Sequence, residues 1–286
     1  TMYSASDPLA DKKADIERRR QEELNNSITD KDKVIFGHPT IGKSFLKKQG
    51  EDKFITLDDD YANEVNAFVD ANRGSETRQE YKGRKPKEYN EFMLNLYDRL
   101  KAQAQKEGKI LFVSNTNILK ERMSDFDKVI TIPKEEFKRR FDERGATYGF
   151  EDWKSDIDAT VSKVNKSKVI STTGYLANLF QDKINAKYDA EYVDKVKKGE
   201  FTAQQAKDAL KEINRLTPEL SKQLDDAELA ALETTPDTTS QEETNDQQAT
   251  SFIDSNPEFF SSINQEAQDI SEEDSLNNLK NNSCKS

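Results

Sequence analysis

The chain has 286 residues, of which 33% are apolar and 35% are charged, so part of its length is expected to stay outside any packed core. Its formal net charge is −11, but residues 234–286 carry eleven acids against two lysines and so account for −9 of that charge. An acidic balance makes nucleic acid and anionic membranes unlikely partners, because both require a basic face.

The remaining composition excludes several other classes of protein. The single cysteine, Cys284, rules out a disulfide framework, and the single histidine, His38, rules out a zinc site of the usual Cys/His kind. No stretch approaches the roughly 20 apolar residues of a membrane span, and the N-terminus lacks a signal-peptide core. We therefore expect a soluble, cytoplasmic protein. Because Thr1 precedes Met2, we also expect a fragment or a processed product.

The first predicted segment, residues 1–32, is a charged helix and linker. Only three residues between positions 8 and 26, among them Ile16, are large and apolar. That pattern predicts an exposed, weakly amphipathic helix rather than part of a core. The basic run at 18–20 suits phosphate contacts or, as the alternative, a solvated helix face.

Residues 33–44, KVIFGHPTIGKS, organise the rest of the chain. The octapeptide at 37–44 matches the phosphate-loop (Walker A) pattern G-x-x-x-x-G-K-[ST] without a mismatch, after an apolar strand and before a helix. In that pattern Lys43 reaches the β- and γ-phosphates and the Ser44 hydroxyl ligates Mg²⁺. The residues expected to hold the nucleotide are Gly37, His38, Pro39, Thr40, Ile41, Gly42, Lys43 and Ser44. The alternative is a glycine turn, since the pattern arises by chance in about one chain in a hundred of this length.

Strands alternate with helices over residues 33–186. The predicted strands are residues 34–36, 54–57, 110–113, 129–132 and 168–171. Between the second and third strands, Tyr89, Met93, Leu96 and Leu100 recur at the spacing of one buried helical face, and Gly108 ends that helix. The alternation predicts an α/β fold with a five-stranded parallel sheet between two layers of helices. The phosphate loop then lies at the carboxyl end of a strand, where open α/β sheets bind ligands.

The acids expected to assist the loop follow the second strand. Asp58 and Asp60 lie at i and i+2 beyond it, so both can face the phosphates, with Asp58 close to Mg²⁺ and an acid close to the phosphate acceptor. The alternative role for these acids, Asp60 above all, is to cap the helix that starts at Tyr61. The third strand ends in Ser114-Asn115 and supplies no acid.

Arginines follow the fourth strand, in the predicted helix KEEFKRRFDERG. Arg140 and Arg144 are one helical turn apart and are expected to clamp the transferred phosphate, with Arg139 beside the nucleotide. A lid that carries them would exclude water as the acceptor. The alternative is a plain charged helix face. The expected catalytic set is thus Lys43, Asp58, Asp60, Arg140 and Arg144.

GHPTIGKS, LDDDY after the second strand and KRRFDERG after the fourth together resemble the P-loop nucleoside and nucleotide kinases, including bacteriophage deoxynucleotide kinases. The resemblance covers residues 33 to about 185. It implies a P-loop NTPase-type three-layer sandwich, Mg-ATP as the phosphate donor, and an acceptor-binding segment between the second and third strands. On that mapping Arg73, Arg78 and Arg84 are candidate contacts to an acceptor phosphate. The chain departs from the family at Ser114-Asn115, where nucleotide kinases usually carry an Asp.

The flanks differ from this central domain. Residues 187–233 are expected to form short helices, with Thr202 and Thr217 as N-caps, and residues 234–286 are expected to be a disordered acidic tail. The charged flanking segments resemble those that join domains in large polyproteins of phages and mobile elements, which would place the chain in a host cytoplasm. The flanking helices and the tail are candidate surfaces for a protein partner.

The sequence therefore favours an Mg-ATP-dependent phosphotransferase acting on a nucleotide, a nucleoside or another small metabolite. The alternative is a nucleotide-binding module of a phage polyprotein that uses ATP for assembly or not at all. The acceptor side discriminates between them, because an enzyme should gather Asp58 or Asp60 and at least two arginines beside Gly42.

Overall fold

The computed structural model describes residues 7–50, 52–145 and 150–234. The chain divides into two compact units, and each is described here by itself. The sheet unit is residues 30–176, and the helical unit comprises residues 7–29 together with residues 177–234. The tail predicted at 234–286 lies, apart from Thr234, outside the described residues. No helix in the described ranges combines the length and the apolar character needed to cross a bilayer.

The sheet unit contains five parallel strands in the order β2-β3-β1-β4-β5. The strands are β1 (Val34–Gly37), β2 (Phe54–Thr56), β3 (Ile110–Val113), β4 (Lys128–Thr131) and β5 (Val169–Ser171). Central β1 is buried throughout, and its Phe36 pairs with Val113 on one side and Val129 on the other. Continuous apolar runs suit a sheet covered on both faces. The prediction of an α/β fold with a five-stranded parallel sheet is confirmed.

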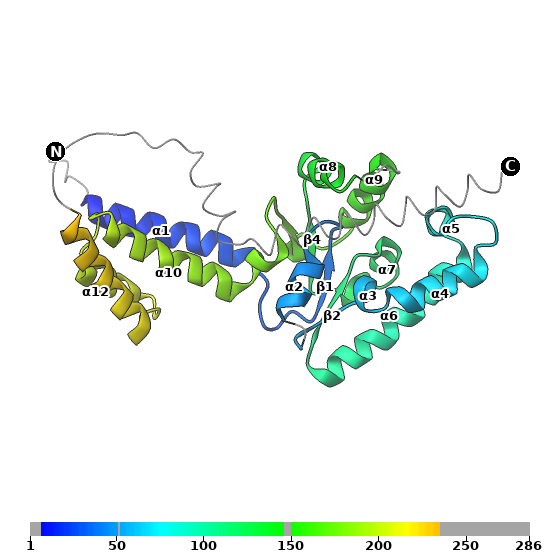
Figure 1. Ribbon diagram of the computed structural model, residues 1–286, viewed down its shortest axis with the longest axis horizontal. Coiled ribbons are helices and arrows are strands. Elements are labelled where there is room, and N and C mark those ends of the chain that lie inside the picture. The colour runs from blue at the N-terminus through cyan, green and yellow to red at the C-terminus, as the bar shows by residue number, and fades with distance from the viewer. Residues whose placement is uncertain (1–6, 51, 146–149, 235–286) are drawn as a thin grey trace. The chain divides into compact units, whose positions relative to one another are not determined.

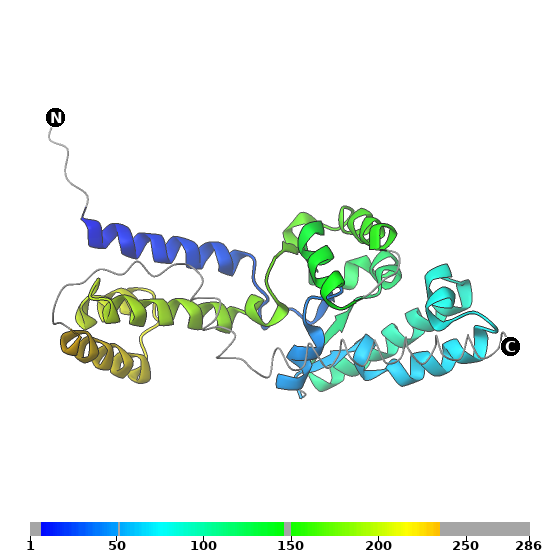
Figure 2. The ribbon, with the colours of Figure 1, turned by 45° about the horizontal axis from the view of Figure 1, so that its top comes forward.

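Helices connect the strands of this sheet. They are α2 (Lys43–Gln49), α3 (Leu57–Asp60), α4 (Ala62–Asn72), α5 (Arg78–Arg84), α6 (Lys87–Glu107), α7 (Thr116–Glu121), α8 (Lys134–Glu143) and α9 (Phe150–Val161), with 3-10 turns η1 (Met123–Asp125) and η2 (Lys166–Lys168). Figures 1 and 2 show α4 and α6 running side by side away from the strands, with α5 at their outer end. As predicted, α6 buries Tyr89, Met93, Leu96 and Leu100 and ends at Gly108, whose φ of 66° suits glycine.

One boundary in this unit matters for the site. The second strand was expected to include Leu57, but β2 ends at Thr56 and Leu57 begins the short helix α3. The acids Asp58 to Asp60 therefore lie in a helical turn and not in extended chain. Side chains two residues apart share a face only in extended chain, so this difference separates the acids.

The helical unit packs α1 (Pro8–Asn25) with α10 (Gln181–Lys197), α11 (Ala203–Glu212) and α12 (Pro218–Glu233), and the turn η3 (Leu176–Leu179) spans the boundary between the units along the chain. The N-terminal helix was expected to be exposed, but its Ile16 is buried in the core of this unit with Tyr188 and Tyr192. Its apolar residues are too few for an amphipathic pattern, and their partners lie far away in sequence. The predicted N-caps Thr202 and Thr217 are confirmed.

Candidate functional site

The phosphate loop connects β1 to α2 at the carboxyl end of the central strand. The strands β3 and β2 lie on one side of β1 and β4 and β5 on the other, so the loop stands where the direction of strand order reverses. Ligands of open parallel sheets bind at this position. Thr40 and Gly42 have φ angles of 72° and 95°, in the left-handed region. The loop therefore requires backbone conformations that few residues adopt without strain.

Both glycines of the loop are also needed for space. A Cβ atom on Gly37 would lie 3.3 Å from Cδ of Lys43 and 3.1 Å from Cγ2 of Ile41, so the lysine stem folds back over the first residue of the loop. A Cβ atom on Gly42 would meet the Tyr175 ring at 3.3 Å. The stem of Lys43, the residue that reaches the phosphates in the Walker A pattern, therefore lies against the start of the loop.

Every backbone carbonyl oxygen from residue 37 to residue 42 accepts a hydrogen bond from the protein. The Gly37 carbonyl accepts from the Ser114 hydroxyl at 2.7 Å, that of His38 from the Ile41 N–H at 3.1 Å, and that of Pro39 from His38 Nδ1 at 2.7 Å. The Thr40 carbonyl accepts from the Arg140 guanidinium at 3.1 Å, that of Ile41 from the Leu176 N–H at 2.9 Å, and that of Gly42 from the Leu46 N–H at 3.2 Å. A loop that binds an anion must turn its carbonyl oxygens away from it. The carbonyl oxygens of residues 37–42 meet this requirement, because each is directed to a donor of the protein.

The three acids of α3 have three different environments. Asp59 accepts a hydrogen bond of 2.6 Å from the Ser44 hydroxyl. Asp60 accepts a hydrogen bond of 3.0 Å from the Thr56 N–H and forms an ion pair with Lys47. The expectation that the acids at i and i+2 share the site does not match this geometry, because successive residues of a helix point about 100° apart. Asp60 therefore holds α3 to β2 and α2, while Asp59, which the sequence analysis did not select, meets the predicted Mg²⁺ ligand Ser44.

Asp58 lies beside Lys43 and the Ser114 hydroxyl. Burial raises the pKa of Asp58, the Lys43 ammonium opposes that shift, the Asp59 charge adds to it, and the Ser114 hydroxyl opposes it. The Asp58 charge in turn contributes, after burial, to a raised pKa of Tyr89 on α6. Asp58 is therefore a half-buried carboxylate between the phosphate loop and the helical segment that connects β2 to β3.

Arg140 is buried against the loop and is already engaged. Its guanidinium donates to the carbonyl oxygens of Thr40 at 3.1 Å, Thr173 at 2.6 Å and Gly174 at 2.8 Å, and to the Glu136 carboxylate at 2.8 Å. It also lies 4.2 Å from the centroid of the Tyr175 ring. In this structure Arg140 fixes the loop to the segment after β5 and does not point into open space.

The other two predicted lid arginines are placed differently. Arg139 is half-exposed and pairs with Glu136 and Glu143 on its own helix. Arg144 is the C-cap residue of α8, and its side chain makes no hydrogen bond or ion pair with another described residue. Arg140 and Arg144, which were expected to face the same phosphate group, thus differ in their contacts, and only Arg140 bonds to the loop in the part of the chain described.

His38 and Lys154 form a buried pair behind the loop. His38 Nε2 lies 3.3 Å from Lys154 Nζ, which also donates to the Ile132 carbonyl oxygen at 2.7 Å and pairs with Asp158 at 2.8 Å. Burial, together with the charges of Lys154 and Lys43, lowers the pKa of His38 to about 4, against the opposing effects of the bond to Pro39 and the Asp158 charge. Sequence reasoning missed Lys154, although its position three residues before Ile157 places it on the apolar face of α9.

The arginines proposed as acceptor contacts pair with acids near them in sequence. Arg73 and Arg78 both bind Asp70, and Arg84 binds Glu76 with two hydrogen bonds. A cation of the same segment that does act on Asp58 is Lys82 on α5, whose charge lowers the pKa of Asp58 against the larger effect of burial.

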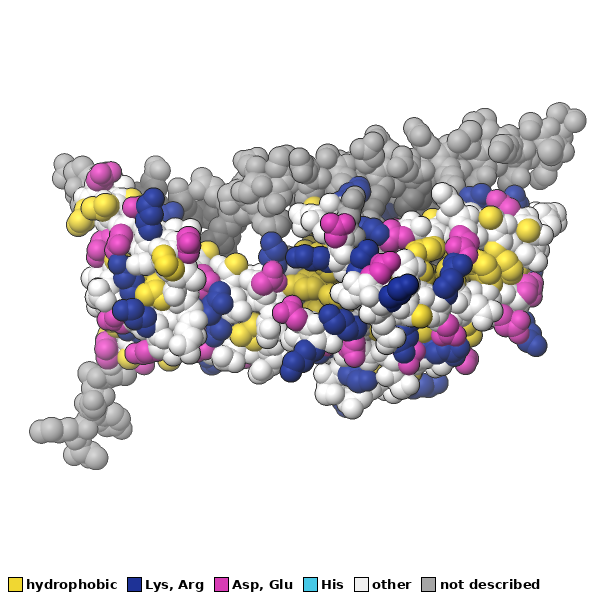
Figure 3. Space-filling view, turned by 90° about the horizontal axis from the view of Figure 1, so that it is seen from below, with side chains coloured by type: hydrophobic (Ala, Val, Ile, Leu, Met, Phe, Trp, Pro, Cys, Tyr) yellow, Lys and Arg dark blue, Asp and Glu magenta, His cyan; other side chains and the backbone are white. Residues whose placement is uncertain are grey.

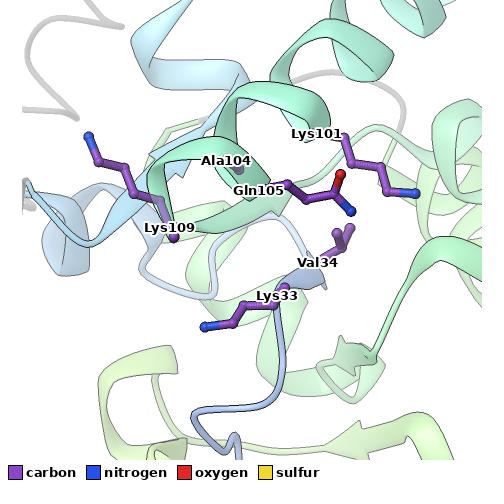
Figure 4. A pocket seen from close by; sticks show the side chains of 7 residues that line it. Lys33, Val34, Lys101, Ala104, Gln105 and Lys109 are labelled. Atoms are coloured by element: carbon purple, nitrogen blue, oxygen red, sulfur yellow. The ribbon is translucent and has the colours of Figure 1, made fainter.

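A pocket at the opposite edge of the sheet does not resemble an anion site. It lies at the amino end of β1 and is lined by Lys33, Val34, Lys101, Ala104, Gln105, Gly108 and Lys109. Figure 4 shows the amino groups of its three lysines pointing away from one another. On the molecular face in Figure 3, basic and acidic side chains are interspersed over the described residues, so this face offers no extended basic surface.

Comparison with protein-family models, with curated proteins and with solved structures gave no match. The interpretation of the site therefore depends on its own geometry and chemistry.

Proposed function

We propose that the chain is a phosphotransferase that uses an Mg²⁺–nucleoside triphosphate and transfers a phosphoryl group to a small acceptor, a nucleotide, a nucleoside or another metabolite. One observation carries the proposal. A loop with all its carbonyl oxygens turned onto protein donors stands at the switch point of the sheet, and Lys43, Ser44, Asp58 and Asp59 meet there.

The donor side has the groups that a triphosphate needs. Lys43 supplies positive charge over the loop, where the β- and γ-phosphates would lie. Mg²⁺ prefers oxygen ligands and is usually held by one or two carboxylates together with the phosphates. The Ser44 hydroxyl, the Asp59 carboxylate bonded to it and the nearby Asp58 fit that requirement. No group of three or more His, Cys, Asp or Glu side chains within the described residues could hold a metal alone. When bound, Mg²⁺ supplies charge neutralisation.

On the acceptor side, Asp58 is the residue suited to receive a proton. Where the acceptor is a hydroxyl group, its oxygen bonds to the transferred phosphorus as its O–H bond breaks, the proton passes to an Asp58 carboxylate oxygen, and the bond to the leaving diphosphate breaks. Burial has raised the pKa of Asp58, which makes it a better base than an exposed carboxylate. Lys82 on α5 and Tyr89 on α6 both interact electrostatically with Asp58, and we expect the acceptor to approach from their side.

A second candidate is a nucleotide-binding module that hydrolyses ATP slowly or not at all. The engagement of Arg140 favours it, because a guanidinium bonded to three backbone carbonyl oxygens is not available to stabilise charge on a transferred phosphate.

Calorimetric titration with Mg-ATP, followed by ATP turnover against a panel of nucleosides and nucleoside monophosphates, tests the proposal. Lys43→Ala should weaken Mg-ATP binding about tenfold or more, a loss of at least roughly 1.4 kcal/mol. Lys48→Ala is the matched control, since Lys48 is an exposed lysine of the same helix. Equal affinity of parent and Lys43→Ala would reject the proposed donor site. Binding without turnover on any acceptor would favour the second candidate.

A further inference from the structure

Among the donors that hold the carbonyl oxygens of the phosphate loop, the imidazole of His38 has a special requirement. Its Nδ1 lies 2.7 Å from the Pro39 carbonyl oxygen, so Nδ1 must carry a hydrogen to donate there. The guanidinium and the backbone N–H groups on the other carbonyls are donors in every state they adopt near neutral pH, and the Ser114 hydroxyl can turn its one hydrogen to the Gly37 carbonyl or to Asp58. Only the Pro39 carbonyl depends on the choice of a tautomer.

Lys154 determines which tautomer His38 adopts. An ammonium group donates and never accepts, so His38 Nε2, 3.3 Å from Lys154 Nζ, must be the bare, accepting nitrogen. The other hydrogens of Lys154 Nζ are directed to the Ile132 carbonyl oxygen at 2.7 Å and to Asp158 at 2.8 Å. Lys154 is 3% exposed and His38 is fully buried, so water has little access to the pair.

The neighbours of the imidazole keep the ring in one orientation. The edge of the His38 ring meets the Phe137 ring at a centroid distance of 4.4 Å and an angle of 80°. The charged groups that act on the imidazole are Lys154 and Asp158 from α9 and Lys43 from α2. Two ammonium groups against one carboxylate disfavour an imidazolium ion at this position, which leaves a neutral ring with a hydrogen on Nδ1.

We propose that Lys154 is a positioning residue of the phosphate loop. By bonding His38 Nε2 it fixes the Nδ1–H tautomer, and that tautomer turns the Pro39 carbonyl oxygen away from the space over the loop. If this bond is lost, the imidazole can take the Nε2–H tautomer, whose bare Nδ1 would repel the Pro39 oxygen at 2.7 Å. The inference rests on the proposed function in one respect, that the loop holds a phosphate chain.

The experiment uses the full chain labelled with ¹⁵N-histidine. Because His38 is the single histidine, one imidazole spin system reports the tautomer without assignment. We expect a protonated Nδ1 and a bare Nε2 at pH 7. An Nε2–H tautomer or an imidazolium ion in the unmutated protein at pH 7 would overturn the proposal without any variant.

Lys154→Met keeps the length of the stem and removes the donors. It should shift His38 toward the Nε2–H tautomer and weaken Mg-ATP binding by about tenfold, the range seen when a residue that orients a ligand is replaced. Lys163→Met, at an exposed lysine just beyond α9, is the matched control and should change neither reading. If Lys154→Met does not fold, Lys154→Arg offers a second variant, because a guanidinium still donates and should preserve the Nδ1–H tautomer.

The outcomes separate the two proposals. A shifted tautomer with unchanged Mg-ATP affinity would overturn the positioning role of Lys154 and leave the proposed function intact. An unchanged tautomer in Lys154→Met would also overturn it. Failure of the unmutated protein to bind Mg-ATP would reject the proposed function, and the tautomer measurement would still decide whether Lys154 sets the state of His38.

Discussion

The two sides of the phosphate loop hold their charged side chains in contrasting ways. On the side of α8 and α9, Arg140 and Lys154 are each 3% exposed and bond mainly to backbone carbonyl oxygens and a buried imidazole. On the side of α3, α4 and α5, Asp59, Arg78 and Arg84 lie at or near the surface, where they pair with other side chains. One side is fixed before any ligand arrives, and the other can exchange its partners.

The difference follows from the cost of removing each kind of contact. A buried cation whose partners are removed leaves unsatisfied groups in a medium of low dielectric, so such contacts hold one geometry. Exposed ion pairs contribute little and rearrange easily. If the chain transfers phosphate as proposed, the donor loop is preorganised, while the acceptor side is able to adapt to a substrate.

Among the substitutions that test this difference between the two sides of the loop, the one at Arg140 is expected to have the largest effect. Arg140→Met should lower the free energy of unfolding by about 3–5 kcal/mol, because it strips a buried donor from Thr40, Thr173 and Gly174. Arg139→Met, one residue away, removes only surface pairs and should cost less than about 1 kcal/mol. Chemical denaturation of both variants measures the difference. Similar losses in the two would show that Arg140 does not fix the loop.

A second prediction concerns pH. The pKa of His38 is lowered to about 4 by burial, Lys154 and Lys43, so the unfolded chain binds more protons than the folded one between pH 4 and pH 6.5. Stability from this group is therefore complete above pH 6.5 and is lost as the pH falls toward 4. The free energy of unfolding should fall over that range by on the order of 3 kcal/mol more in the parent than in His38→Asn. Parallel pH profiles of the two proteins would contradict the prediction.

On the acceptor side, the third prediction separates two neighbouring acids. If the chain transfers phosphate as proposed, Asp58→Asn should lower kcat on the order of a hundredfold while Mg-ATP affinity changes little. Asp60→Asn loosens contacts to the Thr56 N–H and Lys47 and should reduce thermal stability with little change in kcat. Steady-state kinetics and melting curves of both variants make the test. A larger loss of kcat in Asp60→Asn than in Asp58→Asn would instead support the expectation from the sequence that Asp60 shares the site with Asp58.

The smallest expected effect is at the exposed arginines of α5. Arg78→Ala breaks a pair with Asp70 at the surface and should leave kcat/KM within about twofold of the parent. Arg84→Ala serves as its companion, since its pair with Glu76 is equally local. A tenfold rise in KM for an acceptor in either variant would instead support the phosphate contacts that the kinase resemblance implies.

Sequence predicted the elements that depend on local patterns and missed the contacts that depend on distance in the chain. The loop follows from eight consecutive residues and the strands from continuous apolar runs. In contrast, Ser114, Arg140 and Leu176 hold carbonyl oxygens of a loop that precedes them by more than 70 positions, and no local pattern indicates such partners. Asp59 was missed because the chain after β2 was expected to be extended, whereas a helical turn brings a different acid to Ser44.

Thr40 has a consequence for how the phosphate loop keeps its shape. A β-branched residue in the left-handed region is strained by roughly 1–2 kcal/mol, and the Thr40 hydroxyl is buried without a hydrogen-bond partner among the described residues. The residue would therefore relax if nothing opposed it, and the contact that opposes it is the Arg140 guanidinium on its carbonyl oxygen. The contact from Arg140 thus holds a strained backbone conformation in the loop. If the loop binds a nucleotide as proposed, a movement of α8 that draws Arg140 away from the Thr40 carbonyl oxygen should release Thr40 and weaken the hold of the loop on the phosphates.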